Sequence, residues 1–182
     1  LEKLKNDESE YVRRSVANNL NDIAKDNPQI VINIAQTWIG QHKETDKLIK
    51  HACRTLLKQG QADIMDLFGL AKPEHIDIEH FELEESVESG SKVGFAFRLA
   101  TTAARLGKVR MEYAVDFMKS NGKLSRKVFK ISESDISAQN KYVSKSHSFK
   151  NISTRKHYPG KHGLAIIING HELEYGEFQL LS

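Results

Sequence analysis

The hydrophobic positions of residues 1–70 repeat with the period of an α-helix. Val12, Val16, Leu20 and Ile23 recur every three or four residues, which predicts one buried stripe along a helix that begins after Ser9 as its N-cap. The segment Asp26-Asn27-Pro28 ends this helix, because proline disfavours helical geometry in the residue before it.

Three further helices are expected over residues 30–40, 45–59 and 62–68. The second helix should turn five side chains inward, namely Ile30, Val31, Ile34, Ala35 and Trp38. Short helices joined by tight turns are typical of stacked HEAT-like repeats, which need about three repeats for stability. Only one and a half to two pairs fit here, and the chain begins with Leu1 rather than Met, so we expect a truncated repeat array cut from a longer protein.

Beyond residue 88 the pattern changes to the alternation of β-strands. Residues 92–101 and 108–119 place hydrophobic side chains at every second position, and residues 125–131 and 163–181 continue the pattern, the last as a hairpin turning at Asn169-Gly170. Strands at this spacing without helices predict an antiparallel β-sandwich of immunoglobulin-like type. The fold class is therefore α plus β in separate domains: helical repeats over 1–72, an acidic linker over 73–88 and a sandwich over 89–182.

Charge separates the same regions. Residues 1–70 carry ten basic and ten acidic side chains, whereas residues 89–182 carry 16 basic and seven acidic ones, a net charge of +9. Such a basic module favours a polyanion such as nucleic acid. No apolar stretch approaches a membrane span, so no membrane association is expected, and the single Cys53 fits a reducing cytoplasm.

The polar side of the first helix is the candidate site. It carries Arg14, Ser15, Asn18, Asn21, Asp22 and Lys25. Amides, hydroxyls and arginine can bind phosphate oxygens, but a carboxylate repels them. Asp22 makes sense opposite a local cation, such as an alkylated purine or a sugar with oxocarbenium character; otherwise it only pairs with Lys25 or caps a turn.

The strings "LKNDESEYVRRSVANNLNDIAKDNP" and "HACRTLLKQG" resemble the C-terminal repeats of the AlkC-type alkylpurine DNA glycosylases, relatives of AlkD with a HEAT-like fold. "MEYAVDFMKSNGKLSRKVFKI" and "SFKNISTRKHYPGKHGLAIIINGHEL" resemble the immunoglobulin-like domain that some members carry after those repeats. The resemblance covers nearly the whole chain. The family's earlier repeats, with a catalytic-site glutamate, should then lie upstream of Leu1.

This resemblance implies a base excision repair enzyme that hydrolyses the N-glycosidic bond of a cationic base such as 3-methyladenine. Asp22 matches the family's active-site aspartate, where a carboxylate would stabilise the sugar cation and orient water. No metal or organic cofactor is implied. The expected partner is duplex DNA containing alkylated bases, with no obligate protein partner, in the cytoplasm and nucleoid of a bacterium; the fragment alone should be nearly inactive.

The residues expected to bind DNA lie on both halves: Arg13, Arg14, Ser15, Asn18, Lys25, Arg54, Arg126, Lys127, Arg155, Lys156, His157, Lys161 and His162. The last five belong to the turn "STRKHYPGKHG", where proline and glycine should expose the cations. A merely solubilising loop explains that turn as well, and ion pairing explains Arg54 as well. The histidine spacing argues against a zinc site.

A second function remains open at this point. The chain could be a non-catalytic DNA-binding or scaffolding module of HEAT-like repeats, in which Asp22 is structural. The charge asymmetry fits both functions, and the asparagine–aspartate face favours the enzyme.

Overall fold

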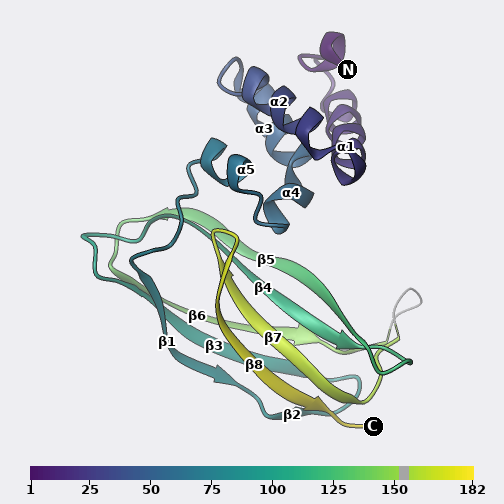
Figure 1. Ribbon diagram of the computed structural model, residues 1–182, viewed down its shortest axis with the longest axis vertical. Helices are drawn as coiled ribbons and strands as arrows, with labels where there is room; N and C mark the ends of the chain where they lie inside the picture. Colours follow the sequence, from purple (N-terminus) through teal and green to yellow (C-terminus); the bar gives the residue numbers. More distant parts are fainter. Residues whose placement is uncertain (152–155) are drawn as a thin grey trace. The chain divides into compact units, whose positions relative to one another are not determined.

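The computed structural model describes residues 1–151 and 156–182 and divides the chain into two compact units, Leu1–Leu70 and Ala71–Ser182. The first is helical and the second consists of strands (Figure 1). Each unit has a hydrophobic core of its own, which agrees with the two periods of the sequence.

The helical unit opens with a short 3₁₀ turn, η1 (Glu2–Leu4), followed by five α-helices. These are α1 (Glu10–Asp26), α2 (Pro28–Trp38), α3 (Lys43–Ala52), α4 (Arg54–Lys58) and α5 (Ala62–Leu67). The predicted stripe of α1 is confirmed at Val16 and Leu20, which are buried against α2, α3 and α4. Ser9 is the N-cap residue by position, but its side chain makes no capping hydrogen bond.

Two details of the helical prediction are wrong. Ile30 is 52% exposed and Ile32 is buried in its place, whereas Val31, Ala35 and Trp38 are buried as predicted. The expected third helix is interrupted at Cys53, whose backbone ends α3 and begins α4.

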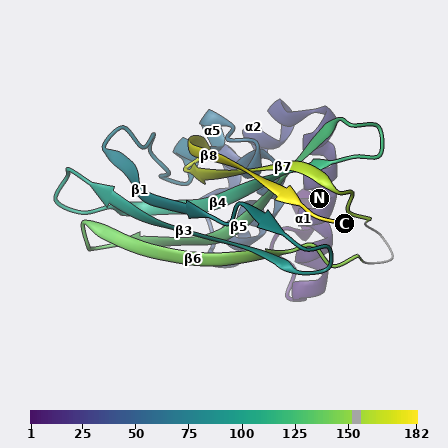
Figure 2. The same cartoon turned by 90° about the horizontal axis from the view of Figure 1, so that it is seen from below.

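The second unit is a sandwich of two sheets (Figure 2). One sheet has the order β1-β3-β6 and the other β2-β8-β7-β4-β5. Their strands are β1 (Ile76–Leu83), β2 (Ser86–Val87), β3 (Lys92–Thr101), β4 (Gly107–Met118), β5 (Leu124–Ile136), β6 (Asn140–Ser148), β7 (Gly160–Ile168) and β8 (His171–Leu180). All pairings are antiparallel except that of the two-residue β2 with β8.

The core of the sandwich confirms the predicted alternation. Phe95 and Phe97 on β3 and Val115 on β4 are almost fully buried between the sheets, together with Leu164 and Ile166 on β7. Side chains of alternate residues meet in this way because successive residues of a strand point to opposite faces of its sheet.

The segment 73–88 is not the acidic linker that we expected, because Ile76–Leu83 forms β1 at the edge of the smaller sheet. Ile76 and Ile78 pack against the core before a register shift, and Phe81 and Leu83 do so after it. The shift lies beside His80, whose φ of 51° is positive. This bulge interrupts the alternation of hydrophobic residues, and the acidic residues lie on the exposed side of the strand. The sequence pattern therefore did not predict a strand here.

The hairpin between β7 and β8 turns at Asn169 and Gly170, as predicted. Both residues have positive φ, 45° and 79°, the combination that a two-residue type I′ turn requires. Asn169 is buried, and its Oδ1 accepts a hydrogen bond from the Arg110 amide at 2.8 Å. Its Nδ2 donates to the carbonyl oxygen of Ala71, also at 2.8 Å. The turn residue thus ties the start of the second unit to β4.

Replacing Asn169 by alanine should destabilise the second unit by about 2–4 kcal/mol, because the buried Arg110 N–H and the Ala71 carbonyl lose their partner and alanine is strained at positive φ. Asn169→Gly is the matched variant, since it loses the same hydrogen bonds without the strain and should cost less. Urea unfolding followed by far-UV circular dichroism measures both. Trp38, which lies in the helical unit, reports that unit separately by fluorescence. An alanine variant as stable as the parent would contradict this role of Asn169.

Candidate functional site

The exposed face of α1 carries most of the residues predicted to form the site. Arg14, Ser15, Asn18, Asp22 and Lys25 are all exposed along it. Their spacing of three and four residues places them on one side of the helix. Tyr11 extends the same face by another turn and is 80% exposed, although we did not include it among the expected site residues.

Asn21 does not belong to this exposed face, contrary to expectation. It is 3% exposed, and its Oδ1 accepts hydrogen bonds from the Thr55 hydroxyl at 2.8 Å and from the Thr55 amide at 3.3 Å. The side chain therefore links α1 to α4. An asparagine can occupy this position because its polar atoms find partners inside the unit.

Asp22 forms an ion pair with Lys25 at 2.7 Å, and the carboxylate remains 67% exposed. The hydrogen bond from Lys25 lowers the pKa of Asp22, and the charges of Lys25 and Arg54 lower it further. Asp22 is therefore ionised at neutral pH. This ion pair with Lys25 is what we expect if Asp22 has only a structural role. The carboxylate is nevertheless exposed, so a ligand can reach it.

Arg13 serves the helical unit internally, contrary to its expected role in binding DNA. Its guanidinium donates to the carbonyl oxygens of Asp7 and Glu8 at 2.7 and 2.9 Å and to Glu44 at 3.2 Å. Only 14% of the side chain is exposed. Arg13 thereby fastens the loop before α1. The sequence could not reveal this role, because Arg13 stands directly next to the exposed Arg14.

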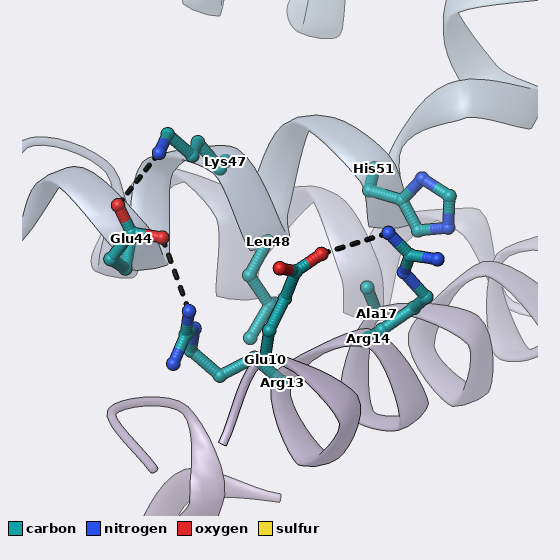
Figure 3. Close-up of a pocket in the computed structure, with 8 residues that line it drawn as sticks. All are labelled: Glu10, Arg13, Arg14, Ala17, Glu44, Lys47, Leu48 and His51. Atoms are coloured by element: carbon teal, nitrogen blue, oxygen red, sulfur yellow. Dashed lines mark hydrogen bonds and ion pairs between the residues drawn. The ribbon is translucent and has the colours of Figure 1, made fainter. Parts of the chain in front are cut away.

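A groove of about 270 Å³ lies between α1 and α3 (Figure 3). Its walls carry charges of both signs together with apolar Ala17 and Leu48, and the charged and polar lining residues are Glu10, Arg13, Arg14, Glu44, Lys47 and His51. Glu44 accepts from both Lys47 and Arg13, whereas Glu10 pairs with Arg14 at 2.8 Å. Ser15 is outside this lining, and its hydroxyl donates to the Tyr11 carbonyl oxygen at 3.0 Å.

Beside the groove, the ring of His51 lies 3.1 Å from the Oδ1 of Asn18, measured from Nε2. The next element supplies Arg54, which donates to the His51 carbonyl oxygen at 2.9 Å. Burial lowers the pKa of His51, and the positive charges of Arg54 and Arg14 lower it further. Asn18, Arg14 and Arg54 thus surround a histidine that is not among the predicted DNA-binding residues.

In the second unit, the basic turn is less exposed than predicted. Arg155, predicted to bind DNA, lies outside the described residues. His157 and His162 are 6% and 1% exposed, which corrects their assignment as DNA-binding cations. Both pack among aromatic rings, with Phe149 at 4.9 Å from His157 and at 5.1 Å from His162.

The remaining basic residues of this unit differ in their surroundings. Lys161 is exposed and pairs with Glu177 at 2.9 Å, and Lys156 is exposed with its ammonium 5.6 Å from the Tyr158 ring centroid. Arg126 is held by both oxygens of Asp116 at 2.8 and 2.9 Å and by Glu172 at 2.6 Å. These carboxylates, Asp116 first, raise the pKa of Arg126. Lys127 is exposed on β5.

The described residues hold no cluster of three or more metal-ligating side chains. Cys53 is buried, and this burial raises the pKa of its thiol to about 12, so it is protonated and unreactive at neutral pH. Within the described part of the chain, no helix has the length and apolar character needed to cross a membrane.

Residues 77–182 match the family described as the C-terminal Ig-like domain of the uncharacterised protein YhaZ. Along its whole length, the chain is similar to YhaZ of Bacillus subtilis, with 44% identity over 99% of this chain and 50% of the relative. The structure is similar to that of the Pseudomonas fluorescens alkylpurine DNA glycosylase AlkC, solved with DNA that contains an abasic site analog. That similarity has a TM-score of 0.93 and 34% identity, and it covers 100% of this chain and 51% of AlkC. The chain thus spans about half the length of either relative.

His162 should make the stability of the second unit depend on pH. Its Nε2 donates to the Tyr158 carbonyl oxygen at 3.0 Å and its Nδ1 accepts from the Met118 amide at 3.3 Å, which fits the neutral ring. Burial lowers its pKa in the folded state. As the pH falls below about 6.5, the unfolded chain therefore takes up the proton first, and the free energy of unfolding falls by up to about 1.4 kcal/mol per pH unit.

The variant His162→Gln should flatten this dependence between pH 5 and 7, whereas His171→Gln, at an exposed position, should leave it unchanged. Urea unfolding at a series of pH values provides the measurement. Parallel stability profiles for the parent and His162→Gln would show that His162 does not titrate in the unfolding transition.

Proposed function

The chain belongs to the family of the YhaZ C-terminal Ig-like domain, and from this premise we propose that it is part of a DNA repair glycosylase that removes alkylated purines. The observation that carries the proposal is the similarity to AlkC over the entire chain, through both the helical and the strand unit. A match of the strand unit alone would leave the helical unit, which carries Asp22, without support.

In the proposed reaction, water replaces a cationic base such as 3-methyladenine at the anomeric carbon of its sugar. The base leaves as a neutral molecule, because the bond to the sugar breaks with its electrons moving to the positively charged ring. The leaving group therefore needs little general-acid assistance. The barrier lies in the positive charge that develops on the sugar, and a fixed carboxylate nearby stabilises that charge.

Asp22 has the properties that this role needs. It is exposed, and its lowered pKa keeps it ionised at neutral pH. Lys25 is an exposed partner rather than a buried one, since 57% of its side chain is accessible to solvent. A DNA ligand can therefore draw Lys25 toward a phosphate and leave the carboxylate to face the sugar.

The non-catalytic alternative is favoured by one observation, the existing pair between Asp22 and Lys25. In that function the helical unit would only bind DNA or a protein, and the aspartate would reduce repulsion between neighbouring surface charges. The two functions differ in what happens when the charge of Asp22 is removed.

Replacing Asp22 by asparagine in the intact protein should reduce excision of 3-methyladenine by about a hundredfold or more, because one charge contact of the transition state is lost. DNA affinity should stay the same or rise slightly, since a negative charge near phosphates disappears. Asp63→Asn is the matched control, as Asp63 is an exposed aspartate on α5 rather than on α1. Single-turnover excision and DNA binding are measured for both variants. A wild-type excision rate for Asp22→Asn would favour the non-catalytic alternative.

We further propose that the basic surface of the second unit contributes to binding duplex DNA without marked sequence preference. Lys127 and Lys156 are the exposed members of the predicted set without a carboxylate partner among the described residues. Arg126 and Lys161 form ion pairs with neighbouring carboxylates, which partly neutralise their positive charge. The contribution of this surface to DNA affinity should therefore come mainly from Lys127 and Lys156.

The affinity of the chain for a short duplex should fall steeply as salt increases, because each phosphate contact releases counterions. Lys127→Gln should reduce the slope of log affinity against log salt by about one. Lys72→Gln, which removes an exposed lysine beside Glu74, should leave that slope unchanged. Fluorescence anisotropy over a range of salt concentrations tests this, and an affinity independent of salt would contradict it.

A further inference from the structure

Three basic side chains gather at one end of the groove, each from a different helix. Arg14 comes from α1, His51 from α3 and Arg54 from α4. Arg14 and His51 both line the groove, and Figure 3 shows the guanidinium of Arg14 beside the imidazole ring. Arg54 is fixed close to them by its hydrogen bond to the His51 carbonyl oxygen. Residues 14 and 51–54 are far apart in the sequence, so only the packing of the helices brings them together.

Nearby acidic side chains compensate this positive charge incompletely. Glu10 pairs with Arg14, but both side chains are more than 60% exposed, so the pair is weak. Glu44 is shared by Arg13 and Lys47, and Asp22 pairs with Lys25. Among the described residues, Arg54 lies within ion-pair distance of no carboxylate. Lys47, on the same helix as His51, also lines the groove and pairs with Glu44 at 2.7 Å.

Asn18 sets the orientation of the His51 ring. Its Oδ1 can accept the Nε2–H of the imidazole at 3.1 Å. With Nε2 engaged in this way, Nδ1 is the nitrogen that gains the proton when the ring becomes charged. The surroundings oppose that step in the free protein, since burial and then Arg54 and Arg14 lower the pKa of His51. A bound anion would offset the two arginine charges and thereby raise the pKa of His51 again.

We propose that Arg14, His51 and Arg54 form a binding site for one phosphodiester of the DNA backbone, beside Asp22. This inference rests on the DNA-binding part of the proposed function and extends it to a named subsite. A phosphodiester supplies oxygen acceptors for both guanidinium groups and one negative charge for the ring. Asn18, which holds His51, lies four residues from Asp22, so the site is about one helical turn from the carboxylate.

Such a site has a consequence for the reaction. A phosphate held one turn from Asp22 fixes the sugar attached to it at a set distance from the carboxylate. The positive charges that bind the phosphate and the negative charge of Asp22 that stabilises the sugar cation then lie on separate side chains. His51 would take up a proton as the phosphate binds, so that the affinity for DNA increases as the pH falls.

The test is the pKa of His51 in the whole 182-residue chain, measured by NMR of the imidazole signals. It is measured without ligand, with an undamaged DNA duplex, with inorganic phosphate and with an acidic peptide. The pKa should rise when the duplex binds. Duplex affinity should also increase as the pH falls from 8 to 6, by up to about tenfold per pH unit for one coupled proton.

His51→Gln should remove this pH dependence, and Arg54→Gln should weaken duplex binding at every pH. His75→Gln, at an exposed histidine of the second unit, is the matched control and should behave like the parent. All three substitutions lie at positions that are not buried, and circular dichroism checks the fold of each variant.

A His51 pKa unchanged by the duplex, or a His51→Gln variant with the parent's pH dependence, would overturn the proposal. An equal rise with inorganic phosphate or the acidic peptide would overturn the assignment to the DNA backbone. Because the duplex is undamaged, failure of the excision prediction leaves this result untouched, and failure here leaves the excision prediction standing.

Discussion

The hydrogen bonds between Asn21 and Thr55 determine which residues of α1 reach the surface. Asn21 is the one polar side chain of α1 that is buried in the helical core, and its oxygen accepts from both the amide and the hydroxyl of Thr55. Rotation of α1 about its axis would break both bonds and expose the apolar stripe of Val16 and Leu20. Asp22 follows Asn21 by one residue, about 100° around the helix. The burial of one side chain therefore directs the next toward solvent, and it holds Asn18 and Arg14 on the side where α3 supplies His51.

Most of the architecture could be predicted from the sequence, because both units bury their hydrophobic faces with a regular period. The stripe of α1 and the alternation on β3 and β4 are confirmed. Two of the wrong predictions are explained by a local irregularity. A bulge beside His80 hides β1, and the backbone at Cys53 divides what looked like one helix into two. Periodicity reports continuous elements well, whereas a bulge or a break leaves residues on each side that look unrelated.

The candidate site was predicted less well, because residue type does not reveal burial. Histidine and arginine in the sequence suggested exposed cations, yet His162 is inside the sandwich, and Arg13 fastens a loop with two hydrogen bonds and donates a third to Glu44 on α3. Asp22 was identified through its resemblance to a family motif, since its spacing alone did not distinguish it from a solvated aspartate. The role of His51 depends on neighbours from α1 and α4, so it requires the tertiary structure. Functional groups assembled from several elements are the part of a site that a single sequence describes least.

Net charge is a poor guide to where this chain carries positive charge that no carboxylate offsets. The strand unit has the large positive excess, but Arg110 is buried between Glu112 and Glu133, and Arg126 lies against Asp116 and Glu172. Within such ion pairs the opposite charges offset each other, so little electrostatic attraction remains for an anionic ligand. The helical unit is neutral by count, yet its acidic partners are distributed unevenly, and Arg54 has no carboxylate at ion-pair distance among the described residues. An anion responds to the local imbalance of charge, because the field of an exposed charge is screened within about 8 Å at physiological salt. In the proposed function, the neutral unit therefore holds a phosphate in a defined position although its net charge is zero.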